Sequence, residues 1–432
     1  MSCVTVYPAP VSGKISAIPA KASLHRLLVA AALSDGPCRI LFSGAVCDDV
    51  AATVSCIEAL GGSVTREEDG FSVVPVRPDR TDRPLLDCRE SGTTARFFLS
   101  VASVLTDGFT LTGRGRLVHR PFRDLIWALE AGGVSFDCSE ESDVFLPLRA
   151  EGRLHPAEFV LPGHISSQYI SGLLLALPLL GGGRIKLTTP PVSAPYLQMT
   201  MEVMAQFGVS VSIRNESGQT VFTVPNRKYR SPGRIAADGD WSAAAFYLTA
   251  GALGGPVTVT GLYGESAQGD RAIVRLLKES GADVICRGEQ CRSASGSEPR
   301  PFVCDLEEIP DLAPILAVRA AYARGVSRLK NGGRLRLKES DRLSGLAEMI
   351  RSMGGCAEVS GDDLVIEGAG HLAGGRAVCP EDHRMMMAAF CAALGAEGPT
   401  VIPHMESAAK SDPAFFETMK QLGVRFETGD RL

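Results

Sequence analysis

The stretch PEDHRMMMAAFCAALGAEGP, residues 380–399, places three ionisable side chains directly before a run of Ala, Met and Phe. The run is shorter than the ~18 apolar residues that a transmembrane helix needs, and it lacks the polar face of a surface helix. It therefore predicts a helix buried in a protein core, with Asp382, His383 and Arg384 at its N-terminal end. Aspartate suits the cap of such a helix, whereas arginine opposes the positive end of the helix dipole.

Five other stretches share this apolar, Ala-rich composition. They are HRLLVAAALSDGP, ARFFLSVASVLTDG, SQYISGLLLALPLLGGG, SAAAFYLTAGALGGP and DLAPILAVRAAYARG. Each of the six stretches closes at a glycine, and these glycines lie 70–74 residues apart from Gly36 to Gly398. A constant period of this length indicates internal repeats, each with one helix that packs inside a core.

A second series of amphipathic helices interleaves with the first. It consists of CIEALGGSV, IWALEAGGVSF, VMAQFGVSV, LLKESGADV, IRSMGGCAEV and TMKQLGVRF. The glycines that anchor this series are Gly62, Gly133, Gly208, Gly281, Gly355 and Gly423. A glycine after a helix favours a left-handed C-cap, and the alternating residues that follow predict short strands.

Six repeats of about 72 residues exceed a single hydrophobic core, because such cores stop growing near 250–300 residues. We predict a mixed α/β (α+β) protein with buried helices and outer sheets, divided into two similar globular domains of three repeats. Breaks rich in Pro and Gly place the boundaries so that residues 1–18 plus 237–432 form one domain and residues 19–236 the other. Two crossing strands should join the domains, with the active site in the interdomain cleft.

Composition excludes several classes of protein. Hydrophobic residues make up 45% and charged residues 22% of the chain, as in globular proteins, and a net charge of −5 argues against a nucleic-acid partner. The N-terminus MSCVTVYPAP lacks the pattern of a signal peptide, and no run is long enough for a membrane span, so we expect a cytoplasmic protein. The twelve cysteines contain no C-x-x-C pair, which favours ordinary reduced thiols, even for the closely spaced Cys286 and Cys291.

The segments just before the six buried helices are polar, and several carry cations. They read IPAKASLHR, CRESGTTAR, PGHISSQ, DGDWS, EIPD and EDHR. Helix capping accounts for Thr93, Ser166 and Asp311, but it does not account for Lys21, Arg26 and Arg384 at positive helix ends. A bound anion would remove that conflict, so these helix ends predict an anion site.

The connections between elements add further charged side chains. Arg120 lies in VHRPFRD, Lys410 in SAAKSDP, and LKESDRL carries Lys338, Glu339, Asp341 and Arg342. Cations together with a few carboxylates predict a site for phosphate and carboxylate groups with a proton donor and acceptor nearby. GESAQGDR in the fourth repeat is interpreted as structural. We expect no metal and no cofactor, because metal-ligand motifs, a P-loop and a dinucleotide fingerprint are absent.

Nine motifs carry a resemblance to one family. In chain order they are PAKASLHR, SGTTAR, HRP, SSQ, VSAPY, IPD, LKESDRL, DHRM and AKSDP. Over essentially its whole length the chain resembles the 5-enolpyruvylshikimate-3-phosphate synthases, also called 3-phosphoshikimate 1-carboxyvinyltransferases, of the enolpyruvyl transferase family. The resemblance implies two domains of three βαβαββ units each, an inside-out α/β barrel arrangement. It also implies transfer of the enolpyruvyl group of phosphoenolpyruvate to the 5-hydroxyl of shikimate 3-phosphate, in the pathway to chorismate and aromatic amino acids.

The resemblance also implies roles for individual residues. It assigns binding of shikimate 3-phosphate to Lys21, Ala22, Arg26, Ser166, Ser167, Gln168, Ser193, Asp311 and Lys338. It assigns binding of phosphoenolpyruvate to Lys21, Gly92, Arg120, Gln168, Arg342, Arg384 and Lys410. The implied catalytic residues are Lys21, Asp311, Lys338 and Glu339, with Asp311 accepting the hydroxyl proton and Glu339 exchanging protons with the methylene carbon.

Two positions depart from the family pattern. Ala22 replaces a usual serine, and Glu90 replaces the usual asparagine of N-A-G-T or N-S-G-T, where it would repel phosphoenolpyruvate unless Arg26 or Arg96 pairs with it. Gly92 is kept, and the resemblance implies that it leaves room for the inhibitor glyphosate.

Two alternatives remain open on the sequence. A sister enolpyruvyl transferase acts on UDP-N-acetylglucosamine with a cysteine where this chain has Arg120, and Cys88 and Cys138 lie near that place but not at it. A non-catalytic anion-binding repeat protein would not need Asp311 and Glu339. The expected partners are therefore the two small substrates, and nothing in the sequence requires more than a monomer.

Overall fold

The computed structural model describes residues 2–77, 82–137 and 144–429. The chain divides into two compact units, and each is described by itself. Unit 1 comprises Met1–Ala20, Gly44–Cys47 and Asp238–Leu432, and unit 2 comprises Lys21–Ser43 and Asp48–Ala237.

Six four-stranded mixed sheets repeat one pattern, in which one edge strand runs parallel to its neighbour and the remaining neighbours run antiparallel. In unit 2 the sheets are β14(Arg234–Ala236)-β3(Cys38–Leu41)-β5(Gly70–Val74)-β4(Ser63–Glu67), β6(Leu85–Asp87)-β7(Gly108–Thr112)-β9(Leu148–Glu151)-β8(Ser135–Asp137) and β10(Glu158–Leu161)-β11(Gly183–Leu187)-β13(Gln219–Val224)-β12(Ser212–Glu216). Strands such as β10 alternate exposed and buried residues, as expected for sheets with one face on a core. The prediction of a mixed α/β protein is confirmed.

Unit 1 contains the other three sheets. They are β22(Gly375–Arg376)-β23(Thr400–Pro403)-β1(Cys3–Val6)-β24(Phe426–Gly429), β16(Asp283–Arg287)-β17(Gln290–Ala294)-β15(Val257–Thr260)-β2(Gly13–Ser16) and β18(Val303–Asp305)-β19(Arg324–Lys330)-β21(Asp363–Ala369)-β20(Cys356–Ser360). The N-terminal strand β1 thus pairs with the last strands of the chain. Two sheets take an edge strand from a distant part of the chain, because β2 pairs with β15 and β14 pairs with β3.

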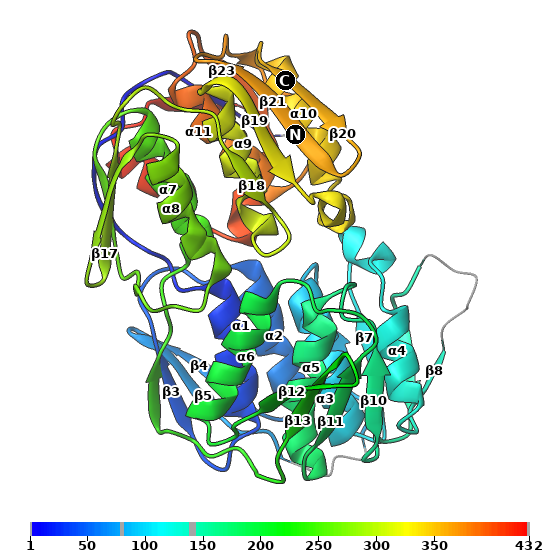
Figure 1. The fold of residues 1–432 in the computed structure, drawn as a ribbon. Coiled ribbons are helices and arrows are strands. Elements are labelled where there is room, and N and C mark those ends of the chain that lie inside the picture. Colours follow the sequence, from blue (N-terminus) through cyan, green and yellow to red (C-terminus); the bar gives the residue numbers. More distant parts are fainter. Residues whose placement is uncertain (1, 78–81, 138–143, 430–432) are drawn as a thin grey trace. The chain divides into compact units, whose positions relative to one another are not determined.

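Three helices of unit 2 are buried on nearly all sides, as their apolar sequences predict. They are α1(Lys21–Ala32), α3(Gly92–Leu105) and α5(Ser167–Ala176). The amphipathic helices α2(Asp48–Ala59), α4(Arg123–Glu130) and α6(Ala194–Gln206) bury one face each. Figure 1 shows the helices of this unit grouped together, with strands such as β3, β10 and β11 at their outer side.

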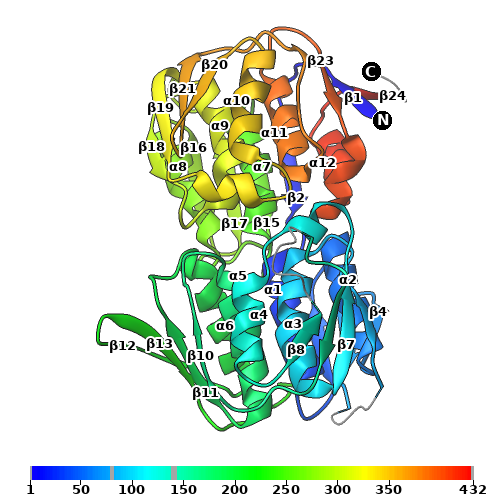
Figure 2. The ribbon, with the colours of Figure 1, turned by 90° about the vertical axis from the view of Figure 1, so that its right-hand side faces the viewer.

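The same arrangement recurs in unit 1. The buried helices α7(Trp241–Leu253), α9(Ala313–Ala321) and α11(His383–Leu394) contact one another pairwise, and α8(Ile273–Glu279), α10(Arg342–Ser352) and α12(Phe415–Gln421) accompany them. Every residue of α11 is buried, which confirms that the stretch after Asp382 is a core helix. In Figure 2, α7, α9 and α11 stand together between the strands of this unit.

The helix-ending glycines differ slightly from expectation. Gly133, Gly208, Gly281 and Gly423 have the positive φ of a left-handed turn, at 98°, 85°, 94° and 89°. In the first and fifth repeats Gly61 and Gly354 take this conformation, at 85° and 86°, instead of the following Gly62 and Gly355. In each repeat one glycine thus supplies the left-handed conformation that ends the helix.

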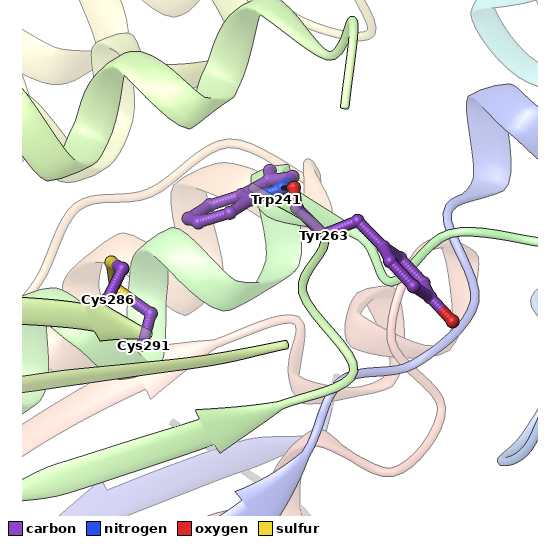
Figure 3. The surroundings of a disulfide bond; sticks show 4 residues. All are labelled: Trp241, Tyr263, Cys286 and Cys291. Atoms are coloured by element: carbon purple, nitrogen blue, oxygen red, sulfur yellow. Dashed lines mark hydrogen bonds between the residues drawn. A yellow bond between two sulfur atoms is a disulfide. The ribbon is translucent and has the colours of Figure 1, made fainter. Parts of the chain in front are cut away.

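One expectation about the cysteines is wrong. Cys286 and Cys291 face each other across the β16–β17 hairpin and form a disulfide, shown in Figure 3. The sequence places them five residues apart, but only the hairpin register brings their side chains together. Among the described helices, none combines the length and the apolar character that a membrane crossing requires.

Candidate active site

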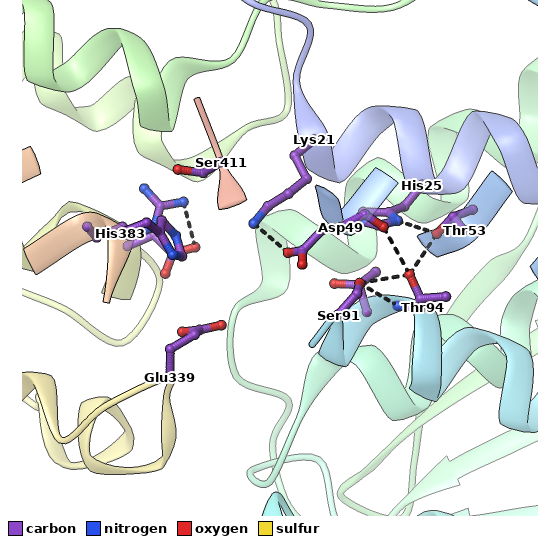
Figure 4. Close-up of polar contacts among 12 residues, drawn as sticks. Lys21, His25, Asp49, Thr53, Ser91, Thr94, Glu339, His383 and Ser411 are labelled. Carbon is purple, nitrogen blue, oxygen red and sulfur yellow. Dashed lines mark hydrogen bonds and ion pairs between the residues drawn. The ribbon is translucent and has the colours of Figure 1, made fainter. Parts of the chain in front are cut away.

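In unit 2, Lys21 opens α1 and donates from Nζ to Asp49 Oδ2 of α2 at 2.9 Å. Figure 4 shows these two side chains pointing toward each other. Lys21 and Asp49 are 19% and 11% exposed, so both remain within reach of a ligand. The pair satisfies the lysine at a positive helix end, where a cation alone would be unfavourable.

A chain of buried hydrogen bonds lies beneath this pair. His25 Nδ1 lies 2.7 Å from Thr53 Oγ1, Thr53 Oγ1 lies 2.8 Å from Thr94 Oγ1, and Thr94 Oγ1 donates to Ser91 Oγ at 2.7 Å. These bonds connect α1, α2 and the N-cap of α3, as Figure 4 shows. They fix the relative positions of the helix ends that carry Lys21 and Gly92.

Arg26 lies one turn further along α1 and is 2% exposed. Its guanidinium donates to Thr200 Oγ1, to the Ala22 carbonyl and to the Tyr196 carbonyl, at 2.7, 2.7 and 3.0 Å. Three of its five N–H groups therefore bind the protein itself, which ties α1 to α6.

Gly92 is the first residue of α3 and lies directly beside two arginines. A Cβ at this position would come within 2.6 Å of Arg96 Nη1 and 2.7 Å of Arg120 Nη1. Arg96 also donates to Gln168 Oε1 at 2.6 Å, and Gln168 Nε2 donates to Thr93 Oγ1 at 2.8 Å. The glycine thus permits guanidinium groups to approach the positive end of the helix.

The SSQ and VSAPY motifs lie at two further helix ends of unit 2. Ser166 caps α5 by accepting from the Gln168 N–H, while Ser167 is the first residue of that helix and is buried. Ser193 precedes α6 with a left-handed backbone, φ 53°. Ala22, the second residue of α1, is partly exposed and offers no hydroxyl.

In unit 1, Asp311 lies in the short helix η4(Pro310–Leu312) among three cations. Its Oδ1 accepts from Lys338 Nζ at 3.4 Å and Arg342 Nη1 at 3.1 Å, and its Oδ2 accepts from Arg384 Nη2 at 3.3 Å. The structure therefore brings together the IPD, KESDR and DHR motifs, which lie far apart in the sequence.

Arg342 opens α10 and is almost completely buried. Besides Asp311, it donates to Glu339 Oε2 at 2.8 Å and to both oxygens of Asp382, from Nε at 2.8 Å and from Nη2 at 3.2 Å. Three carboxylates thus share one guanidinium, and Asp382 binds it through both of its oxygens, the bidentate contact for which arginine is suited.

Asp382 is the N-cap of α11 and accepts from the Arg384 N–H at 2.9 Å, so the predicted cap is confirmed. His383 follows it as a buried ring whose Nδ1 lies 3.9 Å from Asp382 Oδ1. Lys410 ends the short helix η6(Met405–Lys410) and is partly exposed.

Burial and charge shift the pKa values of this cluster in opposite directions. Burial alone would raise the pKa of Asp311, but Arg384, Lys338 and Arg342 hold it well below its usual value. Burial lowers the pKa of Lys338, although the charges of Asp311 and Glu339 oppose the shift. Asp311 is therefore ionised, and it lies beside an ammonium group that gives up its proton more readily than an exposed lysine.

The geometry changes some sequence-based assignments. Thr93 and Asp311 are not helix caps, because Ser91 caps α3 and Asp311 accepts from side chains of other elements. Asp49 was missed as a site residue because no local motif marks it and only the packing of α2 against α1 places it beside Lys21. The sequence suggests Arg96, at the end of the SGTTAR motif, only as a partner for Glu90, and its contact with Gln168 becomes visible only in the folded chain.

The structure also shows where Glu90, which departs from the family pattern, and Cys88 lie. The Glu90 carboxylate lies against the backbone of Gly115, so that a Cβ there would be 2.7 Å from its Oε1. Cys88 is fully buried, and burial raises the pKa of its thiol well above the usual value, which disfavours a role as an acid. Cys138 lies outside the described residues.

Three side chains of a kind that can ligate metal ions lie next to the starts of α11 and η6. Ligand atoms of Glu381, His404 and Glu406 lie within 4.8 Å of one another, at the surface of unit 1. Exposed acidic groups of this kind are common without an ion, and none of the three belongs to the cluster around Asp311.

Comparisons with known proteins agree with this fold and this chemistry. The family model described as EPSP synthase (3-phosphoshikimate 1-carboxyvinyltransferase) matches residues 6–419. The 3-phosphoshikimate 1-carboxyvinyltransferases of Clostridium acetobutylicum and Clostridium kluyveri are 34% and 32% identical to this chain, and each alignment covers 98% of both proteins. A solved EPSP synthase from Acinetobacter baumannii shares the fold, with a TM-score of 0.82 over 100% of both chains at 23% identity.

The family model and the curated relatives identify an enolpyruvyl transferase. The match over residues 6–419 narrows this class further. The chain belongs to the EPSP synthase family, the 3-phosphoshikimate 1-carboxyvinyltransferases.

Proposed function

We propose that Asp311 accepts the proton of the shikimate 3-phosphate 5-hydroxyl as the enolpyruvyl group of phosphoenolpyruvate is transferred to that oxygen and phosphate is released. Membership of the family makes the chain a 3-phosphoshikimate 1-carboxyvinyltransferase, a transferase of the shikimate pathway. The observation that carries the proposal is the partly buried Asp311 carboxylate, which three cations keep ionised. Binding of two anions alone would give no reason for a carboxylate there.

The reaction needs an acid and a base at different atoms. The central carbon of phosphoenolpyruvate becomes electrophilic only as its methylene group is protonated, and a methyl proton must leave again when phosphate departs. We assign that exchange to Glu339, which Arg342 holds at 2.8 Å, and assistance to Lys338. A general acid or base in the right place contributes about 10²–10⁴-fold to the rate.

The remaining residues hold the two substrates. In this proposal shikimate 3-phosphate binds largely to the domain of residues 19–236, through Lys21, Ala22, Arg26, Ser166, Ser167, Gln168 and Ser193, with Asp311 and Lys338 from the other domain. Phosphoenolpyruvate binds largely to the domain of residues 1–18 and 237–432, through Arg342, Arg384 and Lys410, with Lys21, Gly92, Arg120 and Gln168 from the first. The cytoplasmic location, the monomeric state and the absence of a cofactor stay predictions.

Release of inorganic phosphate tests the proposal. We expect release only when shikimate 3-phosphate and phosphoenolpyruvate are both present, and release that depends on UDP-N-acetylglucosamine would contradict it.

Asp311→Asn should abolish turnover while both substrates still bind. Asp341→Asn is the matched control, because Asp341 is a helix cap in the same motif region and should leave turnover nearly unchanged. Turnover that survives in Asp311→Asn would remove Asp311 as the base.

A further inference from the structure

A buried acid follows the segment that carries Lys410. Asp412 is fully buried, whereas Lys410 and Ser411 are partly exposed. The backbone N–H of Asp412 donates to the Ala408 carbonyl at 2.9 Å, and the Ser411 N–H donates to the same oxygen at 3.1 Å. Asp412 therefore belongs to the turn that ends η6, the helix whose last residue is Lys410.

The two carboxylate oxygens of Asp412 bind different parts of unit 1. Oδ1 accepts from the Ala414 N–H at 3.1 Å, a local contact within the turn. Oδ2 accepts from the Tyr247 hydroxyl of α7 at 2.5 Å, across 165 positions of sequence. Burial raises the pKa of Tyr247 well above its usual value, so the phenol keeps its proton and remains the donor. The turn after η6 is thus tied to a buried helix of the core.

Further contacts of this turn reach α7 and α11. The Phe415 ring lies with its centroid 5.1 Å from that of Phe390 in α11 and 6.0 Å from that of Tyr247 in α7. Ser411 Oγ lies 3.8 Å from Met387 Sδ, also in α11. The stretch that follows η6 is therefore fixed between two core helices, and its first residue is bonded to the lysine that ends η6.

Helix and turn capping alone does not explain an aspartate at this position. A serine or asparagine would accept from the Ala414 N–H as well, without a buried charge. Burial raises the pKa of Asp412 to about 6, so its ionised form is costly here. The contact that only a side chain of this length and charge makes so short is the one with the Tyr247 hydroxyl.

We propose that the Tyr247–Asp412 hydrogen bond fixes the backbone from which Lys410 reaches phosphoenolpyruvate. Tyr247 and Asp412 are then positioning residues for this substrate, and they act through the lysine. The inference rests on the proposed assignment of Lys410 to phosphoenolpyruvate.

Tyr247→Phe tests the hydrogen bond, because it removes the hydroxyl and keeps the ring that packs against Phe415. We expect KM for phosphoenolpyruvate to rise about three- to tenfold, while KM for shikimate 3-phosphate stays nearly unchanged. An unchanged KM for phosphoenolpyruvate would overturn the proposal, and so would an equal rise for both substrates.

Tyr322→Phe is the matched control. Its buried hydroxyl also donates a hydrogen bond within the core of unit 1, to the Ala392 carbonyl at 2.5 Å. Because this contact lies near the other end of α11, the variant should lower the melting temperature without changing either KM. The split between the two KM values thus separates positioning from loss of stability.

Combination with Lys410→Ala shows whether the pair acts through the lysine. If it does, Tyr247→Phe should change KM for phosphoenolpyruvate by less than about twofold once Lys410 is already alanine, because coupled residues are not additive. A further three- to tenfold rise in that background would overturn the proposal. An unchanged KM in Lys410→Ala alone would instead overturn the assignment of Lys410 to this substrate.

Asp412→Ser removes the hydrogen bond from its other side. Serine can still accept from the Ala414 N–H, but its shorter side chain does not reach Tyr247. If Tyr247→Phe does not fold, this variant decides. A rise in KM for phosphoenolpyruvate alone supports the pair, and an unchanged KM overturns it.

Discussion

The buried carboxylate of Asp382 accepts hydrogen bonds from the Arg342 guanidinium through both of its oxygens. Oδ2 lies 2.8 Å from Nε, and Oδ1 lies 3.2 Å from Nη2. The side chains of Arg342 and Asp382 are 1% and 0% exposed, so neither is compensated by water. The same carboxylate caps α11 through the Arg384 N–H. One aspartate therefore orients two of the arginines assigned to phosphoenolpyruvate.

Replacement of Asp382 by asparagine should separate these two tasks. Asparagine caps helices as well as aspartate does, but it removes the one fully buried carboxylate among the three that pair with Arg342. Breaking one side of a buried ion pair costs about 3–5 kcal/mol, so we expect that loss in the free energy of unfolding measured with urea. Asp341→Asn changes an N-cap that is 40% exposed and should cost far less. Equal losses in the two variants would contradict a stabilising ion pair.

Gly92→Ala should weaken the site of phosphoenolpyruvate without unfolding the protein. The new methyl group would lie 2.6 Å from Arg96 Nη1 and 2.7 Å from Arg120 Nη1, so the guanidinium groups must move. If this movement weakens the arginine contacts with phosphoenolpyruvate by about 1.4 kcal/mol, KM for phosphoenolpyruvate rises tenfold. Glyphosate should lose affinity in parallel. Inhibition assays at fixed shikimate 3-phosphate would measure both effects.

Gly264→Ala is the matched control for this change. A Cβ at Gly264 meets no atom within 4 Å, so its kinetics should equal those of the natural enzyme. An unchanged KM in Gly92→Ala, with the melting temperature also unchanged, would show that the arginines near α3 do not contact this substrate. Absence of any inhibition by glyphosate in the natural enzyme would contradict the sensitivity that Gly92 implies.

Lys410→Ala should raise KM for phosphoenolpyruvate much more than KM for shikimate 3-phosphate. Lys410 closes η6 and is assigned to the former substrate alone, so loss of its charge removes a contact of about 1.5–3 kcal/mol, or roughly 10–100-fold in KM. Initial rates with each substrate varied in turn would show the split. Lys420→Ala, in α12 and paired with the exposed Glu417, should change neither constant. Equal rises for the two substrates would remove the assignment.

The repeats and the buried helices were predictable because they depend on local hydrophobic patterns. The Ala/Met run after Asp382, for example, has no polar face, so its burial and its cap follow from a few adjacent residues. The family motifs likewise identified Asp311, Lys338 and Arg342, which the structure places in direct contact. These parts of the fold and the site are encoded over short distances.

Other features depend on residues that only the folded chain brings together. Asp49 follows Lys21 by 28 positions and belongs to no motif, yet it is the carboxylate that pairs with the lysine. Cys286 and Cys291 lie opposite each other because the β16–β17 register aligns them.

His25 should make stability fall in mild acid. Its pKa is lowered from 6.5 to about 3, mainly by burial. The charge of Asp49 opposes this shift, and the charges of Lys21 and Arg26 add to it. The unfolded chain therefore binds this proton below pH 6.5 while the folded chain does not. The stabilisation is complete above pH 6.5 and is lost as the pH falls toward 3, by about 1.4 kcal/mol per pH unit.

His25→Asn tests this linkage, because its amide retains a partner for Thr53 and does not titrate. Urea unfolding should show that the natural protein loses about 2–3 kcal/mol more than the variant between pH 6.5 and pH 4.5. His371→Asn, at a ring that is 58% exposed, should leave the pH dependence of the natural protein unchanged. Parallel curves for His25→Asn and the natural protein would mean that the buried ring takes up its proton in the folded state, and that burial does not exclude its charge.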